Sequence, residues 1–375
     1  MSAKQLPALG NARRIVIKLG SSLVADVANA APRRDFLVTF AADLAVLHKA
    51  GKEIVLVSSG AVALGRKHVG LGAGSLSLDE KQAAAAAGQP LLMQAWSEAL
   101  SPHSIGTAQL LLTLDDSERR KRYLNARATF STLLRHRLVP VVNENDTVAT
   151  AELKFGDNDR LAARVAVMIS ADVLVLLSDI DGLYDRDPRK SKDARFIERV
   201  DALSPEIVAM GGDSASAVSS GGMRTKLDAA AMCLAAGCSM AIAAGEAPHA
   251  LQELADGGKA TWFVAATKPA VARKHWIATS VAANGTLVID EGAERALGQG
   301  KSLLPAGVLT VEGNFERGDT VAVKNATGTL LARGICNYSA AEAKRILGKK
   351  TDAIAGILGY EGSGTLIHRD DLALL

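Results

Sequence analysis

The sequence predicts an α/β protein: a three-layer αβα sandwich with a mostly parallel sheet, plus a small C-terminal β-rich barrel. Two patterns before residue 265 predict the sandwich. Short β-branched runs, typical of strands buried on both faces of a sheet, alternate with longer stretches that have the apolar spacing of helices. A third pattern, short apolar runs separated by glycines after about residue 281, predicts the barrel.

The individual elements follow from the same patterns. The expected strands of the sandwich are 14–19, 54–57, 108–113, 138–142, 173–177 and 239–243. The expected helices are 36–50, 81–100, 161–169 and 226–236. We expect helix 81–100 to break near Gly88-Gln89-Pro90, because proline lacks a backbone N–H. The alanine run at 83–87 indicates a tightly packed helix, and the barrel should contain strands at 307–311 and 319–323.

Length and composition allow two domains of ordinary size. The chain has 375 residues, 48% of them hydrophobic, which is enough to fill two cores. The formal net charge of +3 comes from 43 basic and 40 acidic residues and gives no electrostatic argument for nucleic acid or a membrane as partner. We expect a first domain at 12–265, a linker at 266–280 and a second domain at 281–375.

The cysteines and the absence of long apolar runs indicate the compartment. Cys233, Cys238 and Cys336 are odd in number and lack Cys-x-x-Cys spacing, so neither a disulfide framework nor a zinc site is predicted. No uncharged run approaches the roughly 20 residues that cross a bilayer, and the N-terminus lacks the apolar core of a signal peptide. We expect a cytoplasmic protein.

Two polar segments follow the apolar run at 138–142. They are Asn143-Glu144-Asn145-Asp146 and Gly156-Asp157-Asn158-Asp159. Open α/β sheets bind ligands beyond the carboxyl ends of their strands, so these residues are candidates for a ligand crevice. Asp and Asn are also common in turns, and this stretch alone leaves two ordinary polar turns as the alternative.

Three glycine turns are candidates for phosphate binding, although P-loop and Gly-x-Gly-x-x-Gly motifs are absent. Lys18 ends the first strand just before Gly20, and Ser58-Ser59-Gly60 follows the second strand. The strongest candidate is the segment 219–226, because it opens a helix. Unpaired amides, the helix dipole and Lys226 then meet at one place, which favours an anion.

These charges together suit phosphoryl transfer. Lys18 and Lys226 can hold the oxygens of the transferring phosphoryl group, and Asp159 can hold both lysines. Carboxylates near the phosphates would attract Mg²⁺ bound mainly through the nucleotide, and we predict no dedicated metal ligand. A carboxylate acceptor, with a pKa of about 4, is already ionised at neutral pH and needs no general base.

Two sets of motifs run through the chain. The motifs of the first part are Ile17-Lys18-Leu19-Gly20-Ser21-Ser22, Val57-Ser58-Ser59-Gly60-Ala61, Asn143-Glu144-Asn145-Asp146, Gly156-Asp157-Asn158-Asp159, Leu177-Ser178-Asp179-Ile180-Asp181-Gly182-Leu183-Tyr184 and Gly221-Gly222-Met223-x-Thr225-Lys226. The motifs of the tail are Ser302-Leu303-Leu304-Pro305-Ala306-Gly307-Val308, Gly313-x-Phe315 and Arg317-Gly318-Asp319. The first set resembles the glutamate 5-kinases of the amino-acid kinase family, and the second resembles a PUA domain.

The resemblance implies the amino-acid kinase fold and ATP-dependent phosphorylation of the side-chain carboxylate of L-glutamate to L-glutamyl 5-phosphate, the first step of proline biosynthesis. It implies catalytic roles for Lys18, Lys226 and Asp159. The implied ATP-binding residues are Lys18, Ser178, Asp179, Ser220, Gly221, Gly222, Met223, Arg224, Thr225 and Lys226. The implied substrate-binding residues are Ser59, Asp146 and Asn158, with Asn143 and Asp157 as neighbours.

The resemblance also implies partners, and two alternative functions stay open. ATP is expected as co-substrate, L-proline as feedback inhibitor, and the chain as a homo-oligomer. One alternative is another amino-acid kinase, such as one with aspartate as acceptor. The other is a regulatory or RNA-binding protein with a vestigial kinase domain. The presence of Lys18, Asp159 and Lys226 argues against a vestigial kinase domain. The region from residue 281 has 10 basic and 11 acidic residues, which argues against strong RNA binding.

Overall fold

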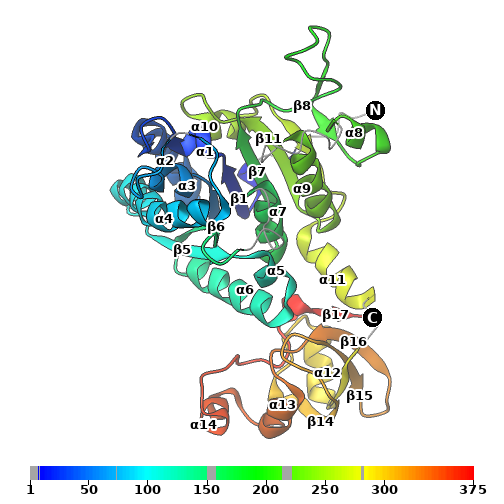
Figure 1. Ribbon diagram of the computed structural model, residues 1–375. Helices are drawn as coiled ribbons and strands as arrows, with labels where there is room; N and C mark the ends of the chain where they lie inside the picture. The colour runs from blue at the N-terminus through cyan, green and yellow to red at the C-terminus, as the bar shows by residue number, and fades with distance from the viewer. Residues whose placement is uncertain (1–6, 8, 73, 150–157, 213–221, 280–282) are drawn as a thin grey trace. The chain divides into compact units, whose positions relative to one another are not determined.

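The computed structural model describes residues 7, 9–72, 74–149, 158–212, 222–279 and 283–375. The chain divides into two compact units, Met1–Pro269 and Ala270–Leu375, each with its own sheet (Figure 1). Among the described residues, no helix combines the length and the apolarity that a bilayer crossing requires.

The N-terminal unit is built on an eight-stranded sheet with the order β10-β12-β11-β7-β1-β4-β6-β5. Every neighbouring pair in this sheet is parallel except β11 with β12. The strands are β1 (Arg14–Leu19), β4 (Glu53–Ser58), β5 (Thr107–Leu112), β6 (Val139–Glu144), β7 (Val173–Ser178), β10 (Arg199–Val200), β11 (Ser239–Ala244) and β12 (Thr261–Phe263). Two short pairs lie outside it: β2 (Ala25–Asp26) with β3 (Ala31–Pro32), and β8 (Leu183–Tyr184) with β9 (Phe196–Ile197).

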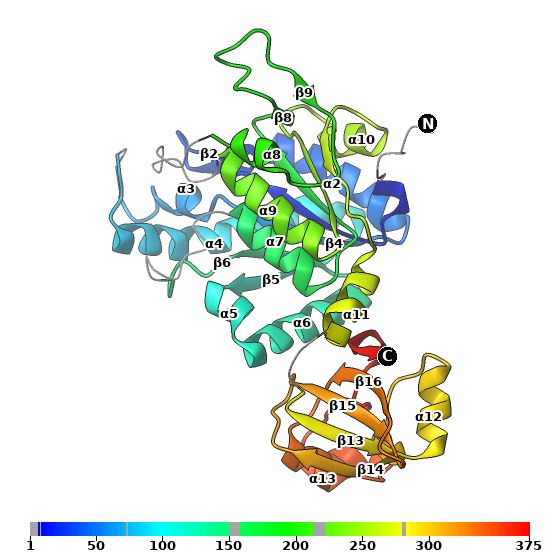
Figure 2. The same cartoon turned by 90° about the vertical axis from the view of Figure 1, so that its right-hand side faces the viewer.

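Helices cover both faces of this sheet, which confirms the predicted three-layer αβα class. Alternate residues of each strand enter different cores, because successive side chains point to opposite faces. Ile15 and Ile17 pack with α2 and α4, whereas Val16 packs with α6, α7 and α9, and the last two lie side by side (Figure 2). The helices are α1 (Ser21–Val24), α2 (Arg34–Lys49), α3 (Ala61–Gly65), α4 (Leu78–Leu100), α5 (Leu114–Glu118), α6 (Arg120–Arg135), α7 (Asn158–Met168), α8 (Pro205–Ala209), α9 (Met223–Ala235) and α10 (Ala250–Ala255).

Helix α4 corrects one expectation. It begins with a capping box formed by Ser77 and Glu80 and continues without a break through Pro90 to Leu100. The expected break was wrong because an interior proline costs about 3 kcal/mol, and burial of a whole helix face in tertiary packing can offset that cost. The buried face includes Trp96, which stacks edge-on against Phe40 of α2.

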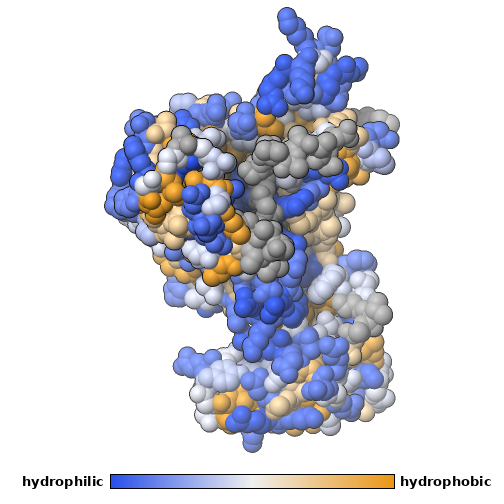
Figure 3. Space-filling model, in the orientation of Figure 1, coloured by the Kyte–Doolittle hydropathy of each residue, from blue (hydrophilic) through white to orange (hydrophobic). Residues whose placement is uncertain are grey.

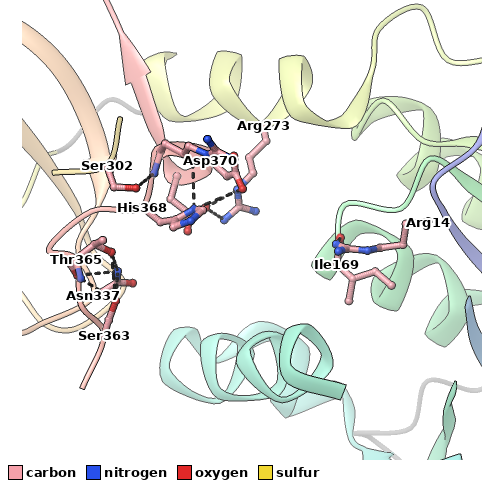
Figure 4. A network of polar contacts seen from close by, with 11 residues as sticks. Arg14, Ile169, Arg273, Ser302, Asn337, Ser363, Thr365, His368 and Asp370 are labelled. Atoms are coloured by element: carbon pink, nitrogen blue, oxygen red, sulfur yellow. Dashed lines mark hydrogen bonds and ion pairs between the residues drawn. The ribbon is translucent and has the colours of Figure 1, made fainter. Parts of the chain in front are cut away.

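The C-terminal unit has a five-stranded sheet with the order β14-β13-β15-β16-β17, in which β13 and β15 are parallel and the other pairs antiparallel. The strands are β13 (Gly285–Ile289), β14 (Val308–Gly313), β15 (Thr320–Asn325), β16 (Leu330–Ile335) and β17 (Leu372–Leu374). The helices are α11 (Pro269–Thr279), α12 (Glu291–Gly298), α13 (Ala340–Ile346) and α14 (Ile354–Leu358). Beside the core, the amide of Asn337 donates to the Thr365 carbonyl oxygen at 3.0 Å (Figure 4).

Helix α11 occupies most of the segment expected as a linker. Ile277 is fully buried against Ile335 and Ala373 of the same unit. Arg273 Nε donates to Asp371 Oδ1 at 2.8 Å, beside the turn that leads into β17 (Figure 4). The domain boundaries expected from the sequence stay a prediction, but α11 packs as the first element of the C-terminal unit.

Candidate active site

A cleft of about 1720 Å³ lies where the parallel strands of the N-terminal unit end. Parallel strands bring their carboxyl ends to one edge, so residues that follow different strands meet there. The lining includes side chains from the ends of β1, β4, β6 and β7 and from the first turns of α7 and α9. Among them are Lys18, Ser59, Asn143, Glu144, Asp146, Asn158, Ser178, Asp179, Met223 and Lys226.

Three buried charged residues form one group here, and two of them, Lys18 and Lys226, line the cleft. Lys18 Nζ lies 2.6 Å from Asp159 Oδ1, and Lys226 Nζ lies 2.9 Å from Asp159 Oδ2. Lys18 reaches this place because it shares a strand face with Val16, toward α7 and α9. Asp159 stands in the first turn of α7 and Lys226 in the first turn of α9. The structure thus brings together three residues that are up to 208 positions apart in the sequence (18 to 226).

The electrostatics of this group favour an anion. Burial opposes ionisation of Asp159, but the positive charges of Lys18 and Lys226 outweigh it and hold the pKa of the carboxyl below its usual value. Two ammonium groups and one carboxylate leave one net positive charge. Each ammonium carries three donor hydrogens and gives one to Asp159, so donors remain for a bound ligand.

A second, neutral cluster lies at the ends of β4 and β6. Asn158 donates through Nδ2 to Ser59 Oγ and, at 3.1 Å, to Asn143 Oδ1. Asn143 in turn donates to Gln89 Oε1 of α4 at 3.0 Å. The same helix fixes the end of β4, because Trp96 Nε1 donates to Ser58 Oγ at 2.9 Å. Asp146 and Glu144 line the cleft on this side.

The end of β7 supplies a further wall. Ser178 Oγ donates to Asp179 Oδ1 at 2.8 Å. Asp181 accepts hydrogen bonds from Lys259 Nζ at 2.7 Å and from the Tyr184 hydroxyl at 3.0 Å. Burial opposes ionisation of Asp181, but these two groups outweigh it and lower the pKa of the carboxyl. The segment between β8 and β9 projects at the top of the view and is strongly hydrophilic (Figure 3).

Of the remaining predicted residues, Gly222 lines the cleft, whereas Arg224 and Thr225 are not among the lining residues. Arg224 Nε lies 3.4 Å from Asp228 Oδ1, and Thr225 Oγ1 donates to Gly222 O at 2.8 Å. The predictions for Asp157, Ser220 and Gly221 fall on residues that the structure does not describe.

Several lining residues were not predicted. Arg66 at the end of α3 and Lys81 in α4 add positive charge to the cleft. Their signal was weak, because each is a basic residue in a helical stretch. Gln89 is not a lining residue but bonds to Asn143, which is one, and its signal in the sequence was clearer. It lies in the buried stripe of α4 with Ala85 and Leu92, where a polar residue is unusual.

Comparisons with known proteins place this site in a family. The model of the amino acid kinase family matches residues 13–244, and that of the PUA domain matches residues 285–358. The chain therefore belongs to the amino acid kinase family.

Curated relatives show which enzymes of the amino acid kinase family this chain is similar to. The chain is 58% identical to "Glutamate 5-kinase" of Paramagnetospirillum magneticum, over 98% of this chain and 99% of that one. It is 53% identical to "Glutamate 5-kinase 1" of Rhizobium meliloti, over 99% and 94% of the two chains, and 52% identical to "Glutamate 5-kinase" of Ruegeria sp., over 98% and 100%. These matches span both units and confirm the resemblance to glutamate 5-kinases with a C-terminal PUA domain.

Proposed function

We propose that the protein transfers the γ-phosphoryl group of ATP to the side-chain carboxylate of L-glutamate, giving L-glutamyl 5-phosphate, the first step of proline biosynthesis. The observation that carries this proposal is the Lys18–Asp159–Lys226 group, whose two lysines line one cleft together with Ser59 and Asn158. Similarity to the glutamate 5-kinases over nearly the whole chain supports glutamate as the acceptor.

The reaction needs charge stabilisation more than proton transfer. A carboxylate oxygen of glutamate forms a bond to the γ-phosphorus, and the bond from phosphorus to the oxygen that leaves with ADP breaks. The acceptor is already ionised, so no base has to remove a proton. Lys18 and Lys226 hold the phosphoryl oxygens, and Asp159 keeps both ammonium groups fixed between the two helices and β1.

Glutamate would bind at the ends of β4 and β6. Ser59, Asn143 and Asn158 offer neutral hydrogen-bonding groups, and Asp146 offers a negative charge that suits the α-ammonium group. ATP would bind along the end of β7 and the start of α9, at Ser178, Asp179 and the segment 220–226. Asp157, Ser220 and Gly221 keep their proposed roles from the family resemblance.

Mg²⁺ would enter with the nucleotide. Within the described ranges no group of three or more His, Cys, Asp or Glu side chains is placed to hold a metal ion. The Asp159 carboxylate faces two ammonium groups, which disfavours a cation there. A nucleotide-bound ion fits this donor set, and when bound it would neutralise phosphate charge.

A substrate-panel assay with the purified full chain tests the function. ADP release is measured with L-glutamate, L-aspartate, N-acetyl-L-glutamate, carbamate and UMP, and acyl phosphate is trapped as the hydroxamate with hydroxylamine. We expect turnover and hydroxamate with L-glutamate. Preference for another acid would establish the sister-kinase alternative, and inactivity with every acceptor would favour a vestigial kinase domain.

Inhibition, assembly and compartment complete the proposal. L-Proline shares the amino-acid head group of the substrate and is proposed to inhibit at millimolar concentration; unchanged activity there would exclude this regulation. Sedimentation should show a homo-oligomer. The three cysteines are buried thiols, which suits the reducing cytoplasm.

A further inference from the structure

Gln89 is a buried amide that reaches the proposed substrate site only through other side chains. It is 8% exposed and lies on the core-facing side of α4. Its Oε1 accepts from Asn143, while its Nε2 is buried and has no hydrogen-bond partner within the described chain. An unpaired buried donor is costly, so packing alone does not account for an amide at this place.

The hydrogen bonds of this cluster all run in one direction. The two hydrogens of Asn158 Nδ2 go to Asn143 Oδ1 and Ser59 Oγ, and Asn143 Nδ2 donates onward to Gln89 Oε1. Ser59 Oγ therefore accepts within the protein, and its O–H hydrogen remains to donate into the cleft. The remaining Oδ1 of Asn158 can accept. This pattern fits the carboxylate and ammonium groups of an amino acid.

The opposite direction would remove that donor. If Gln89 presented Nε2, Asn143 would turn its Oδ1 toward it and its Nδ2 toward Asn158. Asn158 would then have to accept, and its Oδ1 would take the Ser59 hydroxyl hydrogen as well. Whether Gln89 presents an acceptor or a donor thus decides whether the Ser59 hydroxyl can donate a hydrogen bond into the cleft.

We propose that Gln89 is a positioning residue: its Oε1 fixes the direction of the Asn143–Asn158–Ser59 hydrogen bonds and keeps the Ser59 hydroxyl as a donor to the carboxylate of the acceptor. This inference rests on the proposed function, because it takes glutamate as the ligand at this end of the cleft.

Three variants of the full chain test it by steady-state kinetics and by calorimetric titration of L-glutamate. Gln89→Met keeps the length of the side chain and removes the acceptor; we expect the KM and Kd for glutamate to rise about tenfold, with kcat and the KM for ATP within about twofold. Gln89→Glu keeps an acceptor and should stay near wild type. Gln94→Met, on the same helix where Gln94 pairs with Glu98, is the matched control and should change nothing.

A double variant separates positioning from packing. If Gln89 acts through the Ser59 hydroxyl, Gln89→Met added to Ser59→Ala should raise the KM for glutamate no further. Additive effects, or a wild-type KM in Gln89→Met, would overturn the inference, as would equal losses in folded Gln89→Met and Gln89→Glu. Should Gln89→Glu not fold, the double variant decides. Wild-type protein that neither binds nor phosphorylates glutamate would overturn the proposed function and the inference with it, whereas an active wild type with these results overturns the inference alone.

Discussion

Gly65 of α3 and Gly88 of α4 face each other with no room for a side chain on either. A Cβ on Gly65 would lie 1.9 Å from the carbonyl oxygen of Ala84, and a Cβ on Gly88 would lie 1.8 Å from that of Ala61. The two helices therefore pack backbone against backbone. Because α3 follows the Ser59 turn and Gln89 follows Gly88, this contact sets the distance between two parts of the proposed substrate site.

Gly88→Ala tests this contact through stability. In a helix interior alanine is favoured over glycine by about 1 kcal/mol, so helix propensity alone predicts stabilisation. We expect the reverse, a loss of about 1–3 kcal/mol in the free energy of unfolding, because the methyl group meets backbone atoms that cannot move aside. Urea unfolding measures it.

Gly298→Ala in α12 is the control, since nothing lies within 4 Å of a Cβ there. It should be neutral or slightly stabilising. An equally neutral Gly88→Ala would contradict the backbone contact.

Lys226→Ala should lower kcat by about 100-fold or more while the fold is retained. That is the scale of losing one group that stabilises charge in the transition state. Circular dichroism establishes folding and the ADP-release assay gives kcat. Lys49→Ala, at the exposed end of α2, is the control. A folded Lys226→Ala protein with near-normal kcat would remove Lys226 from the catalytic group.

Asp159→Asn should make the protein less stable at pH 7 and less sensitive to acid. The pKa of Asp159 is lower in the folded protein than the value of about 3.9 in an unfolded chain. Its carboxylate therefore contributes stability above about pH 4, and this contribution is lost as the pH falls through the lowered pKa. Removing one partner of a buried ion pair costs about 3–5 kcal/mol.

The measurement is urea unfolding between pH 7 and pH 3, beside Asp228→Asn. Asp228 pairs with Arg160 and Arg224 at the surface, where a pair contributes about 1 kcal/mol or less. If the free energy of unfolding of Asp159→Asn fell with acid as steeply as that of wild type, the pH dependence would come from another carboxylate.

Asp146→Ala should raise the KM for glutamate much more than the KM for ATP. Asp146 lines the cleft beside Asn143, on the side proposed for the amino acid. Steady-state kinetics with each substrate varied in turn gives both constants. Equal increases would assign the acidic segment to the nucleotide instead.

A chain ending at Pro269 should fold and keep glutamate kinase activity. Every described residue of the proposed site precedes this point, and the N-terminal unit has its own sheet and cores. An end at Thr279, as the expected linker would suggest, would leave Ile277 without Ile335 and Ala373. Circular dichroism, size exclusion and kcat test it; a folded but inactive protein would show that the C-terminal unit completes the site.

The sequence predicts best those features that depend on local pattern. The run at 138–142 forms β6 because β-branched residues suit a strand buried on both faces. The helices α7 and α9 start three residues earlier than expected, at Asn158 and Met223, so Asn158 belongs to a helical first turn. Polar residues in a first turn do not follow the apolar periodicity of a helix, so the sequence pattern did not show where these two helices begin.

Features that depend on contacts between distant segments were not predictable. The continuity of α4 through Pro90 depends on its neighbours, and the bond between Gln89 and Asn143 joins residues 54 positions apart. The pairing of Lys259 with Asp181 joins residues 78 apart. By contrast, the grouping of Lys18, Asp159 and Lys226 could be anticipated, because their opposite charges follow strand ends that a parallel sheet brings together.

Because strand β17 comes late in the chain, the two units are completed at different times during translation. All eight strands of the large sheet are complete once residue 263 has left the ribosome, so the kinase unit can begin to fold while the rest is still being translated. The C-terminal unit has to wait, because residues 372–374 supply its edge strand and Ala373 covers Ile277 of α11. A stalled or clipped nascent chain would therefore release an assembled catalytic unit with an unfinished companion.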